Sequence, residues 1–223
     1  MTIAPKLGKK FYDLSDPIYE GMPVFPLLFP LGVEQVASVD AGGFNVHRIT
    51  LATHHGTHVD APRHRYRDGT ILDKIDLDRF IGEGIVLDFS NKEIGSGIDA
   101  DDMEKYSELV RAGEIVICYT GCSTRIGEEW VRSNYTYLEK TAAEWLIQKK
   151  VKSVGVDFFS VDRFGSEESP AHSLLLASGI PIIEEISAEV RHLAGKRIYF
   201  VCLPLKLMAG DGAPARAIAY LLE

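Results

Sequence analysis

Four of the seven histidines of this 223-residue chain lie within twelve residues, between Thr53 and His64. The segment reads Thr-His-His-Gly-Thr-His-Val-Asp-Ala-Pro-Arg-His, so it also contains an aspartate, Asp60. Imidazole and carboxylate groups bind divalent metal ions, and imidazole exchanges protons near neutral pH. No other stretch of the chain is so dense in these groups, and we take the segment as the candidate functional centre.

Three members of the segment form a candidate metal-binding set. The imidazoles of His54 and His58 and the carboxylate of Asp60 are three ligands that leave coordination positions open for water or substrate. An ion held in this way lowers the pKa of a bound water and polarises a carbonyl group. The second oxygen of Asp60 is free to bridge to a second ion. Histidine and carboxylate suit zinc, manganese and iron alike, so the residue types leave the metal open.

The remaining members of the segment have other predicted roles. His64 lies four residues after Asp60 and is predicted to be a free general acid or base rather than a ligand. His55 is expected to point away from its neighbours and to be structural. Gly56 lets the backbone approach an ion closely, and Thr57 is placed to hold a ligand by a hydrogen bond. The alternative is a surface loop that binds metals adventitiously, which the density of donor groups disfavours.

The residues around the segment predict alternating strands and helices. Residues 44–53 predict a strand that runs into the histidines, and glycine, threonine and proline disfavour a helix beyond it. A strand end and a turn therefore produce the spacing of four between His54 and His58. Further strands are expected at 11–14, 84–89, 114–119, 154–158, 180–183 and 197–202, and helices at 99–112, 141–150, 173–178 and 187–193. This pattern predicts one α/β domain over residues 1–223, with a mixed β-sheet flanked by helices.

Composition excludes several classes of protein. The net charge of -8 argues against a nucleic-acid partner, which requires a clustered basic face. No run of eighteen apolar residues occurs and the first ten residues lack an apolar segment, so we expect no membrane partner and no secretion signal. The nucleotide-binding glycine motifs and the Gly-x-Ser-x-Gly motif of serine hydrolases are absent.

Three cysteines, Cys118, Cys122 and Cys202, are too few and odd in number for a disulfide framework. The pair Cys118 and Cys122 has a spacing close to that of zinc ligands, but no second pair follows at the required distance. Because Cys118 also lies in an apolar run, we predict buried, inert thiols. A cytoplasmic location is expected.

The segment from His54 to His64 resembles the H-x-G-T-H-x-D-x-P-x-H signature of the cyclase-like metal-dependent hydrolases, and every fixed position is present. This family includes bacterial kynurenine formamidase and isatin hydrolase. The resemblance extends to segments 11–23, 154–162, 170–184, 204–207 and 211–216. It implies a cyclase-like, swivelling β/β/α architecture.

The resemblance implies roles for individual residues. His54, His58 and Asp60 would bind a first metal ion, and Asp60 would bind a second together with His172 and Glu184. His64 would be the acid/base residue. Outside this set, Glu185 is predicted to be a solvated charge. Asp157 and Asp162 are weighed as partners of the ligands against exposed turn carboxylates, and the exposed alternative is preferred.

The resemblance implies a hydrolase that acts on a small-molecule amide, most plainly an arylformamidase that converts N-formylkynurenine to kynurenine and formate in tryptophan breakdown. The expected cofactor is one or two Zn²⁺ or Mn²⁺ ions per chain. Metal-bound hydroxide would attack the amide carbonyl, and His64 would deliver a proton to the leaving nitrogen. Alternatives are an isatin-type hydrolase of cyclic amides that uses manganese, and a non-catalytic relative that keeps the metal for structure.

One segment departs from the family pattern. Kynurenine formamidases carry a Trp-Pro-Gly-Asp loop after the opening Met-Pro, whereas this chain has Phe25-Pro-Leu-Leu-Phe29. An aromatic and apolar lining is kept, but the substrate contact differs. The resemblance also implies a homodimer or homotetramer in which the loop around 25–30 reaches a neighbour's pocket. Contact with the chain's own core would explain its apolar character equally well.

Overall fold

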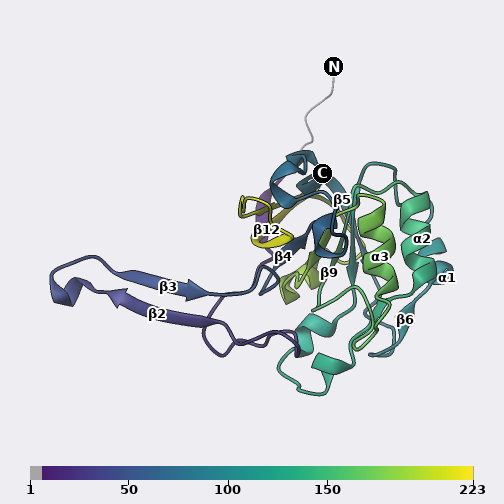
Figure 1. Cartoon of the computed structure of the whole chain (residues 1–223). Coiled ribbons are helices and arrows are strands. Elements are labelled where there is room, and N and C mark those ends of the chain that lie inside the picture. Colours follow the sequence, from purple (N-terminus) through teal and green to yellow (C-terminus); the bar gives the residue numbers. More distant parts are fainter. Residues whose placement is uncertain (1–6, 223) are drawn as a thin grey trace.

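A computed structural model describes residues 7–222, so most of the amino end considered for a secretion signal lies outside the described part. Its centre is a sheet in the order β1-β12-β11-β5-β7-β9-β10-β4, and β4 pairs with β12 as well (Figure 1). The second pairing closes the sheet into a ring to which β1 is added as an outer strand. The strands are β1 Leu7–Asp13, β2 Gly32–Ala37, β3 Val46–Thr50, β4 His58–Asp60, β5 Ile81–Asp88, β6 Gly97–Ile98, β7 Ile115–Tyr119, β8 Tyr137–Leu138, β9 Ser153–Val156, β10 Ile182–Glu184, β11 Arg197–Pro204 and β12 Gly212–Leu222.

The ring is mixed in direction. Strands β5, β7, β9 and β10 run parallel, whereas β4, β11 and β12 pair antiparallel with their neighbours. The α-helices of the described residues lie together on one side of the sheet (Figure 1). They are α1 Ala100–Glu104, α2 Lys140–Gln148 and α3 Pro170–Ala177. The predicted mixed α/β class is confirmed. Among the described residues, no helix has the length and apolar content that crossing a membrane requires.

Alternation along the parallel strands builds two cores, because successive strand residues face opposite sides. Ile85 and Leu87 of β5 pack with buried residues of α2 and α3. Val86, between them, packs with residues of β4, β11 and β12 on the face that the ring encloses. A parallel strand buried on both faces reads as a continuous apolar run, which is why these strands were predictable.

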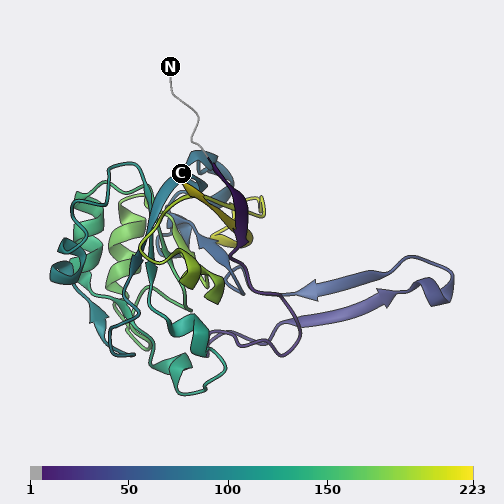
Figure 2. The same cartoon turned by 180° about the vertical axis from the view of Figure 1, so that it is seen from behind.

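Strands β2 and β3 form an antiparallel arm that projects far from the rest of the molecule (Figures 1 and 2). Every residue of β3 is exposed, and Phe44, just before it, keeps 84% of its surface accessible. The predicted strand at 44–53 is confirmed in part, since β3 ends at Thr50 and turns follow it up to the histidines. The pairing strand β2 was not predicted.

Most other predicted elements are present, but the helix predicted at 99–112 is wrong over most of its length. The side chain of Asp99 caps α1, which ends at Glu104. Beyond it the Tyr106 hydroxyl donates to the Asp88 carbonyl oxygen at 2.6 Å, and turns lead into β7. Tertiary contacts therefore override the helical spacing. The predicted helix at 187–193 is a 3-10 helix, Ala188–Leu193.

Asp157 follows β9 and is buried, so the preferred prediction of an exposed carboxylate is wrong. Its carboxylate accepts five hydrogen bonds from the backbone and side chains of Thr120, Gly121 and Ser123, at 2.7 to 3.4 Å. Burial nevertheless raises the pKa of the carboxyl group. The side chain ties the end of β9 to the turn after β7.

Replacing Asp157 with alanine is expected to lower the free energy of unfolding by about 3 kcal/mol, because several buried donors lose their acceptor together. Denaturant unfolding of wild type and variant measures the difference. Asp101→Ala, at an exposed position of α1, is the matched control and should change stability by less than about 0.5 kcal/mol. Equal midpoints for wild type and Asp157→Ala would contradict the structural role.

Candidate metal centre

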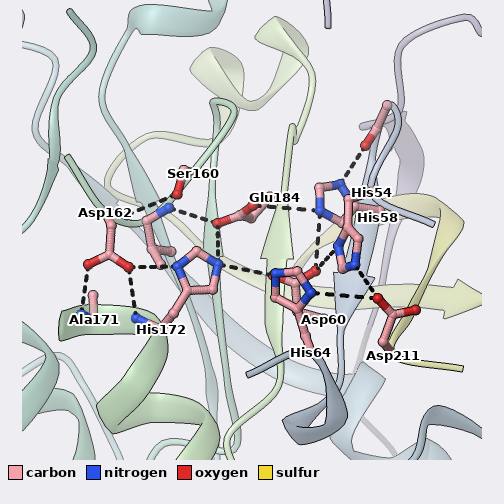
Figure 3. Close-up of polar contacts among 12 residues, drawn as sticks. His54, His58, Asp60, His64, Ser160, Asp162, Ala171, His172, Glu184 and Asp211 are labelled. Atoms are coloured by element: carbon pink, nitrogen blue, oxygen red, sulfur yellow. Dashed lines mark hydrogen bonds and ion pairs between the residues drawn. The ribbon is translucent and has the colours of Figure 1, made fainter. Parts of the chain in front are cut away.

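Strand β4 carries the centre of the site, and its two neighbours supply the surrounding groups (Figure 3). In the β4–β10 register His58 lies opposite Glu184, and in the β4–β12 register Asp60 lies opposite Gly212. Asp211 comes just before Gly212, so closure of the ring brings its carboxylate to the same place. Side chains from three strand segments thus converge where β4 is paired on both edges.

His54 lies in the turn before β4, as the sequence predicted. Its Nδ1 is 2.7 Å from Asp60 Oδ1, and its Nε2 is 2.9 Å from Asp211 Oδ2. Position 212 has to be glycine for this ring to fit, because a Cβ there would lie 2.7 Å from His54 Cε1. Burial disfavours the charged ring, but Asp60 and Asp211 raise the pKa of His54 to about 9.

His58 has one ring nitrogen that is available to a metal ion. Its Nδ1 lies 2.8 Å from the Gly56 carbonyl oxygen, to which it donates, so the neutral ring keeps a lone pair on Nε2. Nε2 is buried, lies 3.2 Å from Asp60 Oδ1 and 3.6 Å from Glu184 Oε2, and has no hydrogen-bond partner among residues 7–222. A buried nitrogen of this kind facing two carboxylates fits a bound divalent cation.

His172 projects from the first turn of α3 toward the same carboxylates. Its Nε2 is 3.3 Å from Asp60 Oδ2 and 3.3 Å from Glu184 Oε1. Its Nδ1 is 2.7 Å from Asp162 Oδ2, an arrangement that orients a ligating imidazole. Asp162 also accepts from the backbone N–H groups of Ala171 and His172 at 2.8 and 3.1 Å. The preferred prediction of an exposed Asp162 is therefore wrong, since this carboxylate is buried and holds His172.

His64 lies at the end of a short 3-10 turn, Pro62–His64, at the edge of the cluster. Its ring centroid is 3.9 Å from that of His54, its Nδ1 is 3.6 Å from Asp211 Oδ2, and its side chain is 35% exposed. Partial burial lowers the pKa of His64, with the nearby rings of His54 and His172 adding to the effect. A neutral, partly exposed imidazole is a suitable proton acceptor near neutral pH.

The donor atoms fall into two overlapping groups, and within each group they lie within 4.8 Å of one another. One group is His54, Asp60 and His64, and the other is His58, Asp60 and Glu184. Asp60 belongs to both, in keeping with its predicted bridging position. This grouping differs from the predicted one. The prediction places His58 with His54 on the first ion and leaves His64 free of metal, whereas here His64 groups with His54, and His58 groups with Glu184. All six residues predicted for the site are nevertheless brought together, and their individual roles stay predictions.

The electrostatics of the cluster favour positive charge. Burial opposes protonation of His58 and His172, yet the carboxylates of Asp60 and Glu184 raise the pKa of both rings well above the usual value. Burial would raise the pKa of Asp60, but His54 and His58 hold it well below the usual value. A divalent cation can supply this positive charge in place of the ring protons, because an imidazole must be unprotonated to bind a metal. The residues thus fit a divalent metal ion.

The residues beside the ligands confirm some predictions and correct others. The Nδ1 of His55 accepts from the Ala52 N–H at 2.9 Å, consistent with its structural role. Thr57 does not hold a ligand side chain as predicted, because its hydroxyl donates to the Glu185 backbone carbonyl oxygen at 2.6 Å and so anchors the chain next to Glu184. The prediction that Glu185 is solvated is wrong, because its side chain is buried, which raises its pKa to about 8.

A cavity of about 400 Å³ opens beside the candidate metal-binding residues. His54, His58, His64, His172 and Glu184 form its polar wall. The apolar part of the lining comes from Phe25, Leu27, Leu28 and Phe159. Phe25 packs on the chain's own Phe159 and Phe164 at centroid distances of 6.4 and 5.6 Å. The loop that replaces the family's tryptophan segment therefore lines this chain's own cavity.

Sequence reasoning missed Asp211, which contacts His54 and flanks His64. Its segment, 211–216, belongs to the family resemblance, but nothing in the sequence marks the aspartate as a partner of His54. The predicted burial at Cys118 and Cys122 is confirmed, and Cys202 is buried as well. All three thiols are unpaired, and burial raises the pKa of each.

A closed mixed sheet with histidine and carboxylate donors on one short strand defines an α/β protein with a candidate metal site. The chain belongs to the family described as "Putative cyclase", whose model matches residues 12–163. It is 31% identical over 214 residues to the kynurenine formamidase of Erythrobacter litoralis, covering 96% of this chain and 94% of that enzyme. It is 30% identical over 210 residues to the kynurenine formamidase of Bacillus anthracis, with coverages of 94% and 96%.

Solved structures agree with this membership. An isatin hydrolase bound to the product analogue thioisatinate superposes with a TM-score of 0.86 at 25% identity, covering 96% of this chain and 93% of that chain. A structure described as a potential metal-dependent hydrolase with cyclase activity gives 0.82 at 28% identity, with coverages of 96% and 98%. The predicted cyclase-like architecture is confirmed.

Proposed function

We propose that this protein is a metal-dependent hydrolase of amide bonds, of the arylformamidase type, that converts N-formylkynurenine to kynurenine and formate. The observation that carries the proposal is the pair of histidine–carboxylate groups that share Asp60, whose histidines line a cavity with aromatic residues. Similarity to two kynurenine formamidases over nearly the whole chain supports the choice of substrate. We further propose zinc or manganese as the ion and the cytoplasm as the location, where reduced thiols persist.

His54, His58, Asp60, His172 and Glu184 would hold the ion or ions. A divalent ion bound there supplies Lewis acidity toward a carbonyl oxygen and lowers the pKa of water. The aromatic wall receives the aryl group and leaves the amide facing the histidines. In hydrolysis, water adds to the carbonyl carbon, the carbon–nitrogen bond breaks, and the nitrogen gains a proton. His64 lies at the edge of the donor groups as the proton carrier, with the Asp211 carboxylate 3.6 Å from its Nδ1.

Hydrolysis of N-formylkynurenine by protein that has been stripped with a chelator and reloaded separately with zinc and manganese tests the proposal. Turnover that disappears on chelation and returns with either ion supports it. No turnover with either ion, despite one or two bound ions per chain, would remove N-formylkynurenine as the substrate.

A second candidate function is hydrolysis of a cyclic aryl amide of the isatin type. The similarity to an isatin hydrolase at a TM-score of 0.86 favours it, as does the loss of the tryptophan loop found in kynurenine formamidases. Isatin is therefore the comparison substrate, and manganese the ion to try first. A higher kcat/KM for isatin than for N-formylkynurenine would select this candidate.

We also propose that the arm of β2 and β3 joins copies of this chain into a homodimer or homotetramer. Two-stranded ribbons are only marginally stable alone in water, and this one exposes apolar side chains along its length. These are Val36, Val39, Phe44, Val46 and Ile49. A second copy that covers them would stabilise the arm, and symmetric assembly is the usual form for identical chains.

Removing the arm is expected to give a monomer. Gly32 and Thr50 are paired at its base, so an Asn-Gly turn can replace residues 33–49. Light scattering after size exclusion measures the mass. The double variant Glu34→Gln/Arg48→Gln, which removes only an exposed ion pair of the arm, is the control and should keep the wild-type mass. A monomeric wild type, or a shortened variant of unchanged mass, would contradict the proposal.

A further inference from the structure

Tyr135 is a buried residue of the cavity wall that has no role in the hydrolysis proposed for the site. It is 2% exposed, yet it lines the same cavity as His58, His172 and Glu184. By geometry its hydroxyl makes no hydrogen bond among residues 7–222, although the Ser160 side chain lies near enough to lower its pKa against the effect of burial. Buried hydroxyl groups are nearly always paired, because leaving one unpaired costs stability. An unpaired hydroxyl at the wall of a cavity therefore indicates a bound ligand that accepts its hydrogen bond.

Aromatic packing fixes the direction of this hydroxyl. The Tyr135 ring lies 4.9 Å from that of Phe158 and 6.5 Å from that of Phe159, and those two rings are 4.7 Å apart. Rotation of the ring about χ1 would break this cluster. A donor held in advance loses little freedom when it binds a substrate, which is the condition for an effective contact.

The charges around the Tyr135 hydroxyl determine which kind of acceptor group it can bind. Burial and the nearby carboxylates of Glu184 and Asp162 raise the pKa of Tyr135, so the phenol stays protonated and can donate. The same carboxylates repel a second anion. A neutral acceptor such as an amide carbonyl oxygen therefore suits the position better than a substrate carboxylate.

We propose that the Tyr135 hydroxyl donates a hydrogen bond to the carbonyl oxygen of the amide that is cleaved. This contact rests on the proposed function and specifies where the substrate's reacting oxygen lies, beside the Glu184 end of the cavity. The carbonyl oxygen gains negative charge as water adds to the carbon, so the hydrogen bond strengthens as the reaction proceeds. Tyr135 thereby contributes more to turnover than to binding.

Tyr135→Phe keeps the ring and removes only the hydroxyl. We expect kcat to fall about 100-fold, the lower range for loss of one such donor, with KM raised no more than about fivefold. The melting temperature should stay the same or rise, because an unpaired polar group is removed. Tyr106→Phe is the matched control, since its hydroxyl bonds the Asp88 carbonyl far from the cavity. It should lower the melting temperature and leave kcat unchanged. Unchanged kcat in Tyr135→Phe, or loss of bound metal from it, would overturn the proposal.

A binding measurement separates this proposal from the proposed function. Calorimetric titration of chelated protein with formanilide, which is not turned over without metal, should give about fivefold weaker binding to Tyr135→Phe than to wild type. If wild type does not hydrolyse N-formylkynurenine but this difference is found, the function is wrong and the contact stands. If wild type is active and the two proteins match in both kcat and affinity, the contact is wrong. If wild type binds no formanilide, the contact is also overturned.

Discussion

Replacing Asp60 with alanine is expected to abolish metal binding and hydrolase activity together. One oxygen of Asp60 lies 2.7 Å from His54 Nδ1 and 3.2 Å from His58 Nε2, and the other lies 3.3 Å from His172 Nε2. The variant removes the only carboxylate that the two donor groups share. We expect kcat/KM to fall about a thousandfold or more, since a catalytic ion contributes several kcal/mol.

Elemental analysis of reloaded and dialysed protein measures the metal content, and circular dichroism tests the fold. Asp60→Asn keeps the shape of the side chain, so it provides a second test if the alanine variant does not fold. Asp101→Ala is the control and should retain both metal and activity. Full metal occupancy in a folded Asp60 variant would show that Asp60 is not the shared ligand.

The part of the site that lies within one short segment could be predicted from the sequence. His54, His58, Asp60 and His64 are close in sequence, so their residue types and spacing were enough to propose a common centre. His172 and Glu184 were reached only through the family resemblance. Their positions depend on the pairing of β10 with β4 and on the placement of α3, and no local pattern encodes either.

The supporting carboxylates show why the remainder could not be predicted. Asp162 and Glu185 come after strands β9 and β10, at positions where a charged residue is expected to be exposed, yet both are buried. Asp211 reaches His54 only because β12 pairs with β4 and closes the ring. The burial of a charged group is set by what packs on it from elsewhere in the chain, and sequence periodicity carries no information about such partners.

The same limit applies to the arm. Strand β3 was predictable from its β-branched residues, but β2 was not, because its residues are largely exposed and show no alternation between a buried and an exposed face. Patterning identifies a strand by the core that it covers. A ribbon with no core of its own gives no such signal, which is consistent with a surface completed by another chain.

Replacing His64 with alanine is expected to lower kcat by about 100- to 10,000-fold while leaving the metal content unchanged, the usual range for a general acid or base. The structure makes this a sharp test, because the donor atoms of His64, His54 and Asp60 lie within 4.8 Å of one another. If His64 is a metal ligand, its removal also releases the metal. If it is a proton carrier, its removal lowers kcat and the metal stays bound.

Metal analysis and steady-state kinetics on the same preparation of His64→Ala distinguish the two roles. His47→Ala on the exposed face of β3 is the matched control and should match the wild type in both measurements. Imidazole added to the His64→Ala reaction should restore part of kcat if the missing group is a proton carrier, because a free base can enter the partly exposed position. Loss of metal from His64→Ala would make His64 a ligand, and the proton would then have to reach the leaving nitrogen from another group.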